Sequence, residues 1–166
     1  NDEAYEDDAV HLVRTRLHLD VGAGASARLF AQGQDAEGFA GSGLNRTNAF
    51  VNQLDLRQLF MELTSPAEAL PAKLKVGRQE LAYGEQRFVG AFDWSNVSRV
   101  FDAVKASWTP TAWAQVDGWF SQVVLANRVG PDSADHGDNF YGLYASLKPL
   151  TDHALDAFLF IRHDRD

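Results

Sequence analysis

The sequence has no cysteine and no long apolar run. Without cysteine the chain offers no disulfide and no thiolate ligand to a metal ion. None of its apolar runs approaches the roughly 18 residues of a membrane-spanning helix. A transmembrane β-strand gives a much weaker hydropathy signal, because apolar and polar residues alternate along it. The lack of such a run therefore argues against a helical membrane protein but is compatible with a membrane β-barrel.

Short catalytic motifs are also missing. The sequence contains no Gly-x-Ser-x-Gly, no His-Glu-x-x-His and no Gly-Lys-Ser/Thr. His136 lies in the acidic stretch Pro131–Asp138, but a lone histidine without EF-hand spacing is typical of a solvated loop. We therefore expect no enzyme, no metal site and no cofactor.

Negative charge dominates and is unevenly placed. The chain carries 23 acidic against 15 basic residues, a net charge of -8. The acids gather before residue 9 and around residues 132–138, as they do in solvated loops. No basic patch is interleaved with aromatic residues, so we expect no nucleic-acid partner.

Apolar and polar residues alternate along most of the chain. From Ala9 to Val21 one parity is apolar, as at Leu17 and Leu19, and the other is polar, as at Arg14 and Arg16. Successive side chains of a strand point to opposite faces, so this pattern predicts a strand with two different faces. We expect an all-β fold, an antiparallel up-and-down meander of about eight strands. The predicted strands are Ala9–Val21, Ala25–Gln32, Leu54–Leu63, Lys73–Tyr83, Arg99–Trp108, Ala112–Val124, Asn139–Leu147 and His153–Arg162.

The connections between these strands alternate in length. Outer-membrane barrels have short periplasmic turns and long external loops, whereas a Greek-key sandwich has no reason to keep that rhythm. We therefore interpret residues 1–166 as one segment of a transmembrane β-barrel. With periplasmic short turns, Asn1–Asp8 ends an external loop, and the segment is an internal piece of a larger barrel. The long connections are Gly33–Gln53, Gly84–Ser98 and Leu125–Asp138, and between them lie Gly22–Gly24, Thr64–Ala72, Thr109–Thr111 and Lys148–Asp152.

The polar parity of the strands would line a pore that carries both signs of charge. A planar guanidinium grips a carboxylate through two parallel hydrogen bonds, so an arginine track favours acidic saccharides. Interspersed acids would keep the substrate from binding too tightly to leave. Alternatively, these charges pair across strands and keep the lumen hydrated. The predicted pore-lining residues are Arg14, Arg16, Arg28, Arg78, Glu80, Lys105, Asp117, Asp156 and Arg162.

The alternation breaks in the predicted strand Lys73–Tyr83. There the apolar parity becomes charged after Gly77, and a bulge at this glycine would turn Arg78 inward. Asp102 falls on the apolar parity of the next strand without an explanation. Elsewhere the lipid-facing residues are expected to be Leu17, Leu19, Leu29, Leu155, Leu159 and Ile161.

The stretch Gly84–Ser98 is too long and too apolar for a simple turn. Long structured loops are usually functional, and in a barrel they can fold into the lumen as a constriction. A cap that packs only on neighbouring loops is the alternative. The predicted constriction residues are Arg87, Phe88, Asp93, Trp94 and Arg99.

Gly77–Trp94, followed by Phe101–Lys105, resembles the alginate-export family of outer-membrane β-barrels. The resemblance implies a bacterial outer-membrane location, with lipid or lipopolysaccharide against the outer face. It also implies passive passage of an anionic polysaccharide or other charged solute, without chemistry. Family members are considerably longer than this chain. Weaker matches are Arg14–Leu17, Gln32–Asp35, Asp55–Gln58 and Phe140–Tyr144.

The rival interpretation is a soluble all-β domain that binds or cleaves carbohydrate. In it, Trp94, Trp113 and Trp119 would stack on sugar rings, and Asp117 would do acid/base work. The two interpretations differ in where the leucines lie, because a soluble domain buries them.

Overall fold

The chain folds into one antiparallel β-sheet. A computed structural model describes residues 11–39, 50–127, 130–150 and 152–165. The predicted external stretch Asn1–Asp8 lies outside these residues. No helix among the described residues is long and apolar enough to span a membrane. The strands are β1 (His11–Ala23), β2 (Ala27–Phe39), β3 (Asn52–Thr64), β4 (Ala72–Gln79), β5 (Phe101–Thr111), β6 (Ala114–Leu125), β7 (Ser133–Leu150) and β8 (His153–Asp164).

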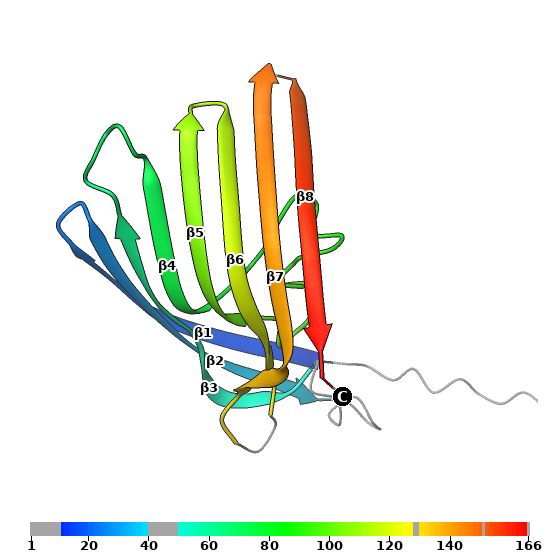
Figure 1. Cartoon of the computed structure of the whole chain (residues 1–166). Coiled ribbons are helices and arrows are strands. Elements are labelled where there is room, and N and C mark those ends of the chain that lie inside the picture. Colours follow the sequence, from blue (N-terminus) through cyan, green and yellow to red (C-terminus); the bar gives the residue numbers. More distant parts are fainter. Residues whose placement is uncertain (1–10, 40–49, 128–129, 151, 166) are drawn as a thin grey trace, which may run out of the picture.

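Each strand pairs with its neighbours in sequence (Figure 1). The order is β1-β2-β3-β4-β5-β6-β7-β8, and every pairing is antiparallel. This meander confirms the predicted fold class. Within the described residues β1 and β8 each have one sheet neighbour, so the sheet is open.

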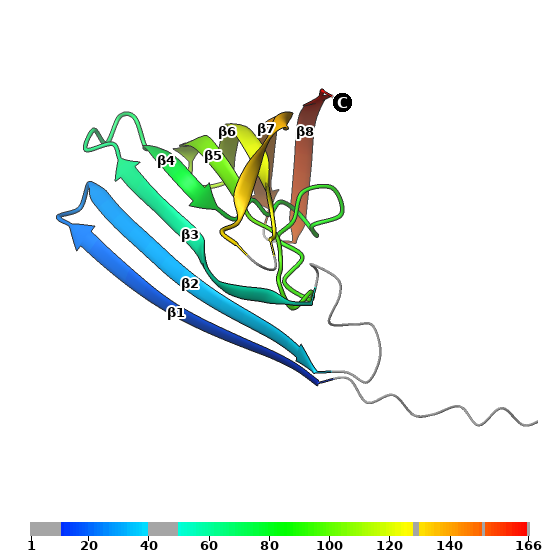
Figure 2. The same cartoon turned by 90° about the horizontal axis from the view of Figure 1, so that it is seen from below.

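The two faces of the curved sheet differ in chemistry. Figure 2 shows the strands as an arc, with the connection between β4 and β5 on its concave side. Leucines cover the convex face, where Leu17 is 76% exposed and Leu159 is 60% exposed. All six residues predicted to face outward are exposed, which confirms that part of the pattern. An apolar outer face and a polar inner face are expected where lipid is the outer solvent.

Three predicted strand boundaries are wrong. β2 runs on to Phe39, β7 begins at Ser133, and β4 stops at Gln79. The residues after Gln32 read as a loop because they are glycines and polar residues. They continue the strand because the concave face is itself polar: Gln34 is buried there and accepts a hydrogen bond from Arg16 Nε at 2.6 Å.

The predicted bulge at Gly77 is also wrong. The pairing of β4 with β3 and β5 runs through Gly77 without a shift, so Arg78 stays on the outward parity. Arg78 is paired there with Asp102, to which its Nε donates at 2.9 Å, and this pair explains the charge on the apolar face. Gly77 is needed for a different reason. Its φ is +123°, and a Cβ would lie 2.3 Å from the Leu59 carbonyl oxygen.

The register shift lies in the neighbouring strand. Gln32 pairs with Gln58 but Gly33 pairs with Leu56, which leaves Arg57 as an extra residue of β3. A bulge of this kind re-aims a side chain. Here Arg57 and Gln58 are both buried, although they are consecutive in the strand.

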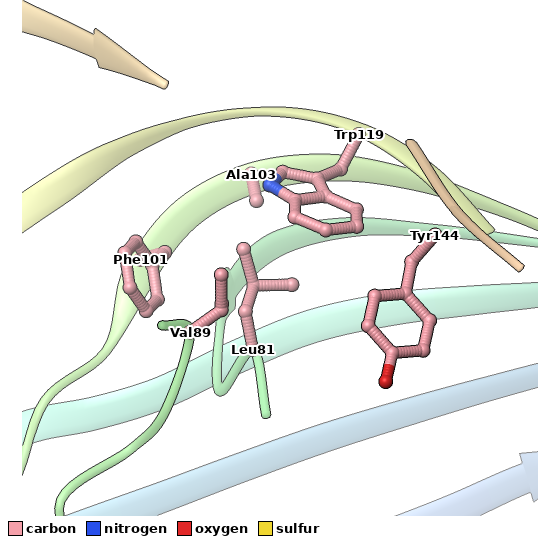
Figure 3. Close-up of a cluster of buried hydrophobic side chains, with 6 residues drawn as sticks. All are labelled: Leu81, Val89, Phe101, Ala103, Trp119 and Tyr144. Carbon is pink, nitrogen blue, oxygen red and sulfur yellow. The ribbon is translucent and has the colours of Figure 1, made fainter. Parts of the chain in front are cut away.

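An apolar cluster ties the β4–β5 connection to the concave face of the sheet. Figure 3 shows Leu81 and Val89, from the connection, beside Phe101 and Ala103 of β5. Trp119 of β6 and Tyr144 of β7 complete the cluster. Burial of these side chains stabilises the connection against the wall.

Candidate functional site

The β4–β5 connection, residues 80–100, leaves the sheet part-way along its neighbours. The pairing of β3 with β4 ends at Leu59, whereas β3 itself continues to Asn52 beside β2. The connection therefore begins beside the middle of β3, not at the edge of the sheet, and it lies against the concave face (Figure 2). Phe92 and Ser98 have φ values of 48° and 62°, which are uncommon for residues other than glycine. Such backbone persists only where the surroundings hold it.

Stacked aromatic rings hold the first part of the connection. The Tyr83 ring lies on the Trp119 ring, with centroids 4.5 Å apart and planes at 6°. Trp119 in turn lies flat over Gly142, where a Cβ would be 2.0 Å from the indole. Only glycine leaves room for this arrangement, so Gly142 sets the position of Trp119 and, through it, of Tyr83.

A buried carboxylate fixes the Tyr83 hydroxyl. Tyr83 Oη donates to Asp117 Oδ2 at 2.9 Å, and Lys105 Nζ lies 3.2 Å from the same oxygen. Gln115 Nε2 donates to the other carboxylate oxygen at 3.0 Å. Burial, and after it the negative charge of Asp117, raises the pKa of Tyr83, so the phenol stays a donor. Lys105 and Asp117, both predicted to line the pore, thus form an ion pair on the concave side.

Two arginines of β1 hold the far part of the connection. Arg16 Nη2 donates to Asp93 Oδ1 at 2.7 Å, and Arg14 Nη1 lies 3.2 Å from the same oxygen. Burial opposes ionisation of Asp93, but the hydrogen bond from Arg16 and the charges of both arginines outweigh it and lower the pKa of Asp93. The cluster of Arg14, Arg16 and Asp93 therefore carries a net charge of +1.

Arg57 also holds the connection, and the sequence pattern missed it. Its guanidinium is buried and bonds to Glu80, to Gln32 Oε1 at 2.9 Å and to Ser98 Oγ at 3.0 Å. Beside it, Asn96 Nδ2 donates to the Phe50 carbonyl at 2.7 Å. Arg57 falls on the apolar parity of its strand, and the bulge that turns it inward leaves no mark in the sequence.

The remaining predicted pore-lining residues are Arg28, Arg162, Asp156 and Arg78. Arg28 binds Asp20 through two hydrogen bonds of 2.8 Å, and Arg162 binds Asp138 in the same way. Asp156 lines a concave hollow with Lys105 and Tyr144. Arg78 is on the convex face, so its prediction as a pore-lining residue is wrong. The pairing favours the alternative in which most of these charges stabilise the wall.

The predicted constriction residues all lie on the connection but differ in setting. Phe88 and Trp94 are 72% and 84% exposed. Arg87 pairs with Glu85 at 2.6 Å, and both side chains are exposed. The Arg99 guanidinium carbon lies 4.5 Å from the centroid of the Phe92 ring. No group of three His, Cys, Asp or Glu residues in the described part of the chain could hold a metal ion.

The geometry is that of a β-wall with an apolar outside, a charged inside and an inward connection. A sequence profile of the alginate export family matches residues 2–166. The chain belongs to the alginate export family. This is a family of outer-membrane β-barrels that act in transport, and the all-β meander agrees with it. No curated protein and no solved structure matches the chain.

In this alginate export family member, two residues that the soluble interpretation assigned to sugar stacking and to acid/base work have other partners. Trp119 is buried beneath Tyr83, and Asp117 is buried against Lys105. Neither presents a free surface to a saccharide. Trp113 lies in the short turn between β5 and β6, whereas Trp94 lies in the β4–β5 connection.

Proposed function

We propose that this chain forms part of the wall of a bacterial outer-membrane channel through which an acidic polysaccharide of the alginate type passes. Membership of the alginate export family supports the class of substrate. The inverted polarity of the sheet supports a lipid environment, because leucines cover the convex face and charges cover the concave one. Lipid or lipopolysaccharide then contacts the leucines, and the solute moves along the concave face.

The observation that carries the proposal is the position of the β4–β5 connection. It lies on the concave side and is tied to β1 by Asp93 and to β3 by Glu80. A segment held in this way narrows the path, and its exposed Phe88 and Trp94 face solvent. We therefore assign residues 80–100 as the constriction.

Passage needs no chemical step in this scheme. Asp93 already occupies Arg14 and Arg16 as a tethered carboxylate, and a substrate carboxylate can replace it in an exchange of similar ion pairs. Such exposed pairs are worth about 1 kcal/mol or less, so exchange between them is fast. Weak, repeated sites of this kind are what conduction requires.

The test is ion selectivity of the protein in planar bilayers. Replacing both Arg14 and Arg16 by Gln changes the net charge of the cluster with Asp93 from +1 to -1, so the anion preference and the flux of uronate oligomers should fall. Lys73→Gln is the control, because it removes one exposed cation that lies outside residues 80–100. The difference should shrink as salt rises from 0.1 M to 1 M, where the Debye length drops from about 10 Å to about 3 Å. Unchanged selectivity in the double variant would refute the proposal.

A further inference from the structure

The β4–β5 connection covers a second feature, a hollow of about 370 Å³ against the wall of β5 to β8. Phe88 and Arg99 border it from the connection, and Phe101 and Phe140 from the strands. Asp135, Asp138 and Arg162 complete its polar rim. The hollow thus combines an aromatic surface with charges of both signs.

Arg99 is the basic residue of this rim that has no acidic partner. Among the described residues no carboxylate lies within salt-bridge distance of it, and its recorded contact is the Phe92 ring at 4.5 Å. Partial burial lowers the pKa of Arg99, and the positive charge of Arg162 lowers it further against the opposing charge of Asp138. A guanidinium remains charged under such shifts, so the rim holds a cation that makes no salt bridge among the described residues.

The other charges of the rim are already engaged. Arg162 uses two donors on Asp138, each at 2.8 Å, and one oxygen of Asp135 accepts the Gly137 amide at 3.0 Å. Asp135 is ionisable and accepts hydrogen bonds without donating any in its charged form. A ligand for this rim must therefore offer a carboxylate to Arg99 and can offer hydroxyl donors to Asp135.

We propose that the hollow binds one uronate residue of a passing chain, with its carboxylate on Arg99 and its ring against Phe88 and Phe140. The inference relies on the proposed function for the substrate class. A planar guanidinium suits a carboxylate, and an aromatic surface suits the apolar face of a sugar ring. A simple inorganic anion would leave the aromatic surface and Asp135 unused. Arg99 is then a specificity residue that tells uronates from neutral sugars.

The test uses titration calorimetry to measure the equilibrium binding of glucuronate and of glucose to the protein in detergent micelles. Arg99→Gln should weaken glucuronate binding about tenfold, as expected for loss of a hydrogen-bonded charge pair. The glucuronate affinity of Arg99→Lys should lie between those of the wild type and Arg99→Gln, because lysine keeps the positive charge but loses the two parallel hydrogen bonds of the guanidinium. Lys73→Gln, which removes an exposed cation of β4 that does not border the hollow, should bind like the wild type. Phe88→Ala should weaken the binding of both sugars. Because the Phe88 side chain is 72% exposed, removing its ring should leave the fold intact.

Glucuronate binding that is equal in the wild type and in Arg99→Gln would overturn the subsite, as would a wild type that binds glucose equally well. Bilayer flux separates this from the proposed function. If the protein binds glucuronate through Arg99 but passes no uronate oligomer, the subsite is supported and the proposed channel function is refuted. If the protein passes the oligomer but Arg99→Gln does not change glucuronate binding, the channel function is supported and the subsite is refuted.

Discussion

Gly142 gives a quantitative test of how the β4–β5 connection is held. In Gly142→Ala the new Cβ would meet three indole atoms of Trp119 at 2.0 to 2.4 Å, so the ring must move. Overpacking of this kind costs about 1 to 3 kcal/mol. Displacing Trp119 also breaks its stacking with Tyr83, worth about 0.5 to 1.5 kcal/mol. We expect the free energy of unfolding to fall by roughly 1.5 to 4.5 kcal/mol, the combined size of these two losses.

Gly118→Ala is the matched control. It makes the same change in the same pair of strands, but its Cβ would meet its nearest neighbours at 3.9 Å, an ordinary contact. It should leave stability unchanged or raise it by up to about 1 kcal/mol. Both variants are refolded into lipid vesicles and unfolded with urea while tryptophan fluorescence is followed.

A double-mutant cycle shows whether Trp119 is the cause. In a Trp119→Leu background the added methyl no longer meets the indole, so Gly142→Ala should cost much less than in the wild type. Gly142→Ala with wild-type stability, or with an equal cost in both backgrounds, would refute the assigned role of the Gly142, Trp119 and Tyr83 stack.

Three further predictions concern Asp93 and the convex face. Asp93→Asn raises the net charge of its cluster from +1 to +2 and frees Arg14 and Arg16, so anion preference in bilayers should rise, opposite to the double arginine variant. Because the pKa of Asp93 is lowered from 3.8 in the folded protein, its contribution to holding the connection is complete above that value and is lost as the pH falls through the folded pKa. The part of the wild-type conductance change that depends on Asp93 should therefore appear at more acidic pH than 3.8, and it should be missing in Asp93→Asn. Leu159→Arg places a charge on the convex face and should cost about 2 to 4 kcal/mol if that position lies near the bilayer midplane, as measured by urea unfolding in vesicles. A Leu159→Arg variant as stable as the wild type, or an Asp93→Asn channel with lower anion preference, would contradict the assignment of the two faces.

The alternation of residues was sufficient to predict the meander and the outward leucines. Leu17 and Leu159 lie in strands whose two parities differ clearly, and each strand pairs with its neighbour in sequence. Arg78 was misplaced because an ion pair with Asp102 allows a charge on the apolar parity, and nothing in the spacing shows that partner.

The candidate site was less accessible from the sequence. The position of residues 80–100 depends on contacts between residues far apart in the sequence, such as that of Arg16 with Asp93, which are 77 residues apart. Arg57 was missed because a bulge in β3 changes the face on which it lies. Local patterns carry neither the partner of a distant charge nor the position of a bulge.

The assignment of the two faces is tested most directly by labelling, for which a chain without cysteine is well suited. Leu17→Cys and Leu155→Cys lie on the convex face, and His18→Cys and Asp156→Cys are their concave neighbours in β1 and β8. Each variant is spin-labelled in lipid vesicles, and its accessibility to oxygen and to a polar nickel reagent is measured. We expect the labels at 17 and 155 to be relaxed by oxygen and those at 18 and 156 by nickel. Labels at all four positions that nickel relaxes equally would contradict a membrane-embedded wall.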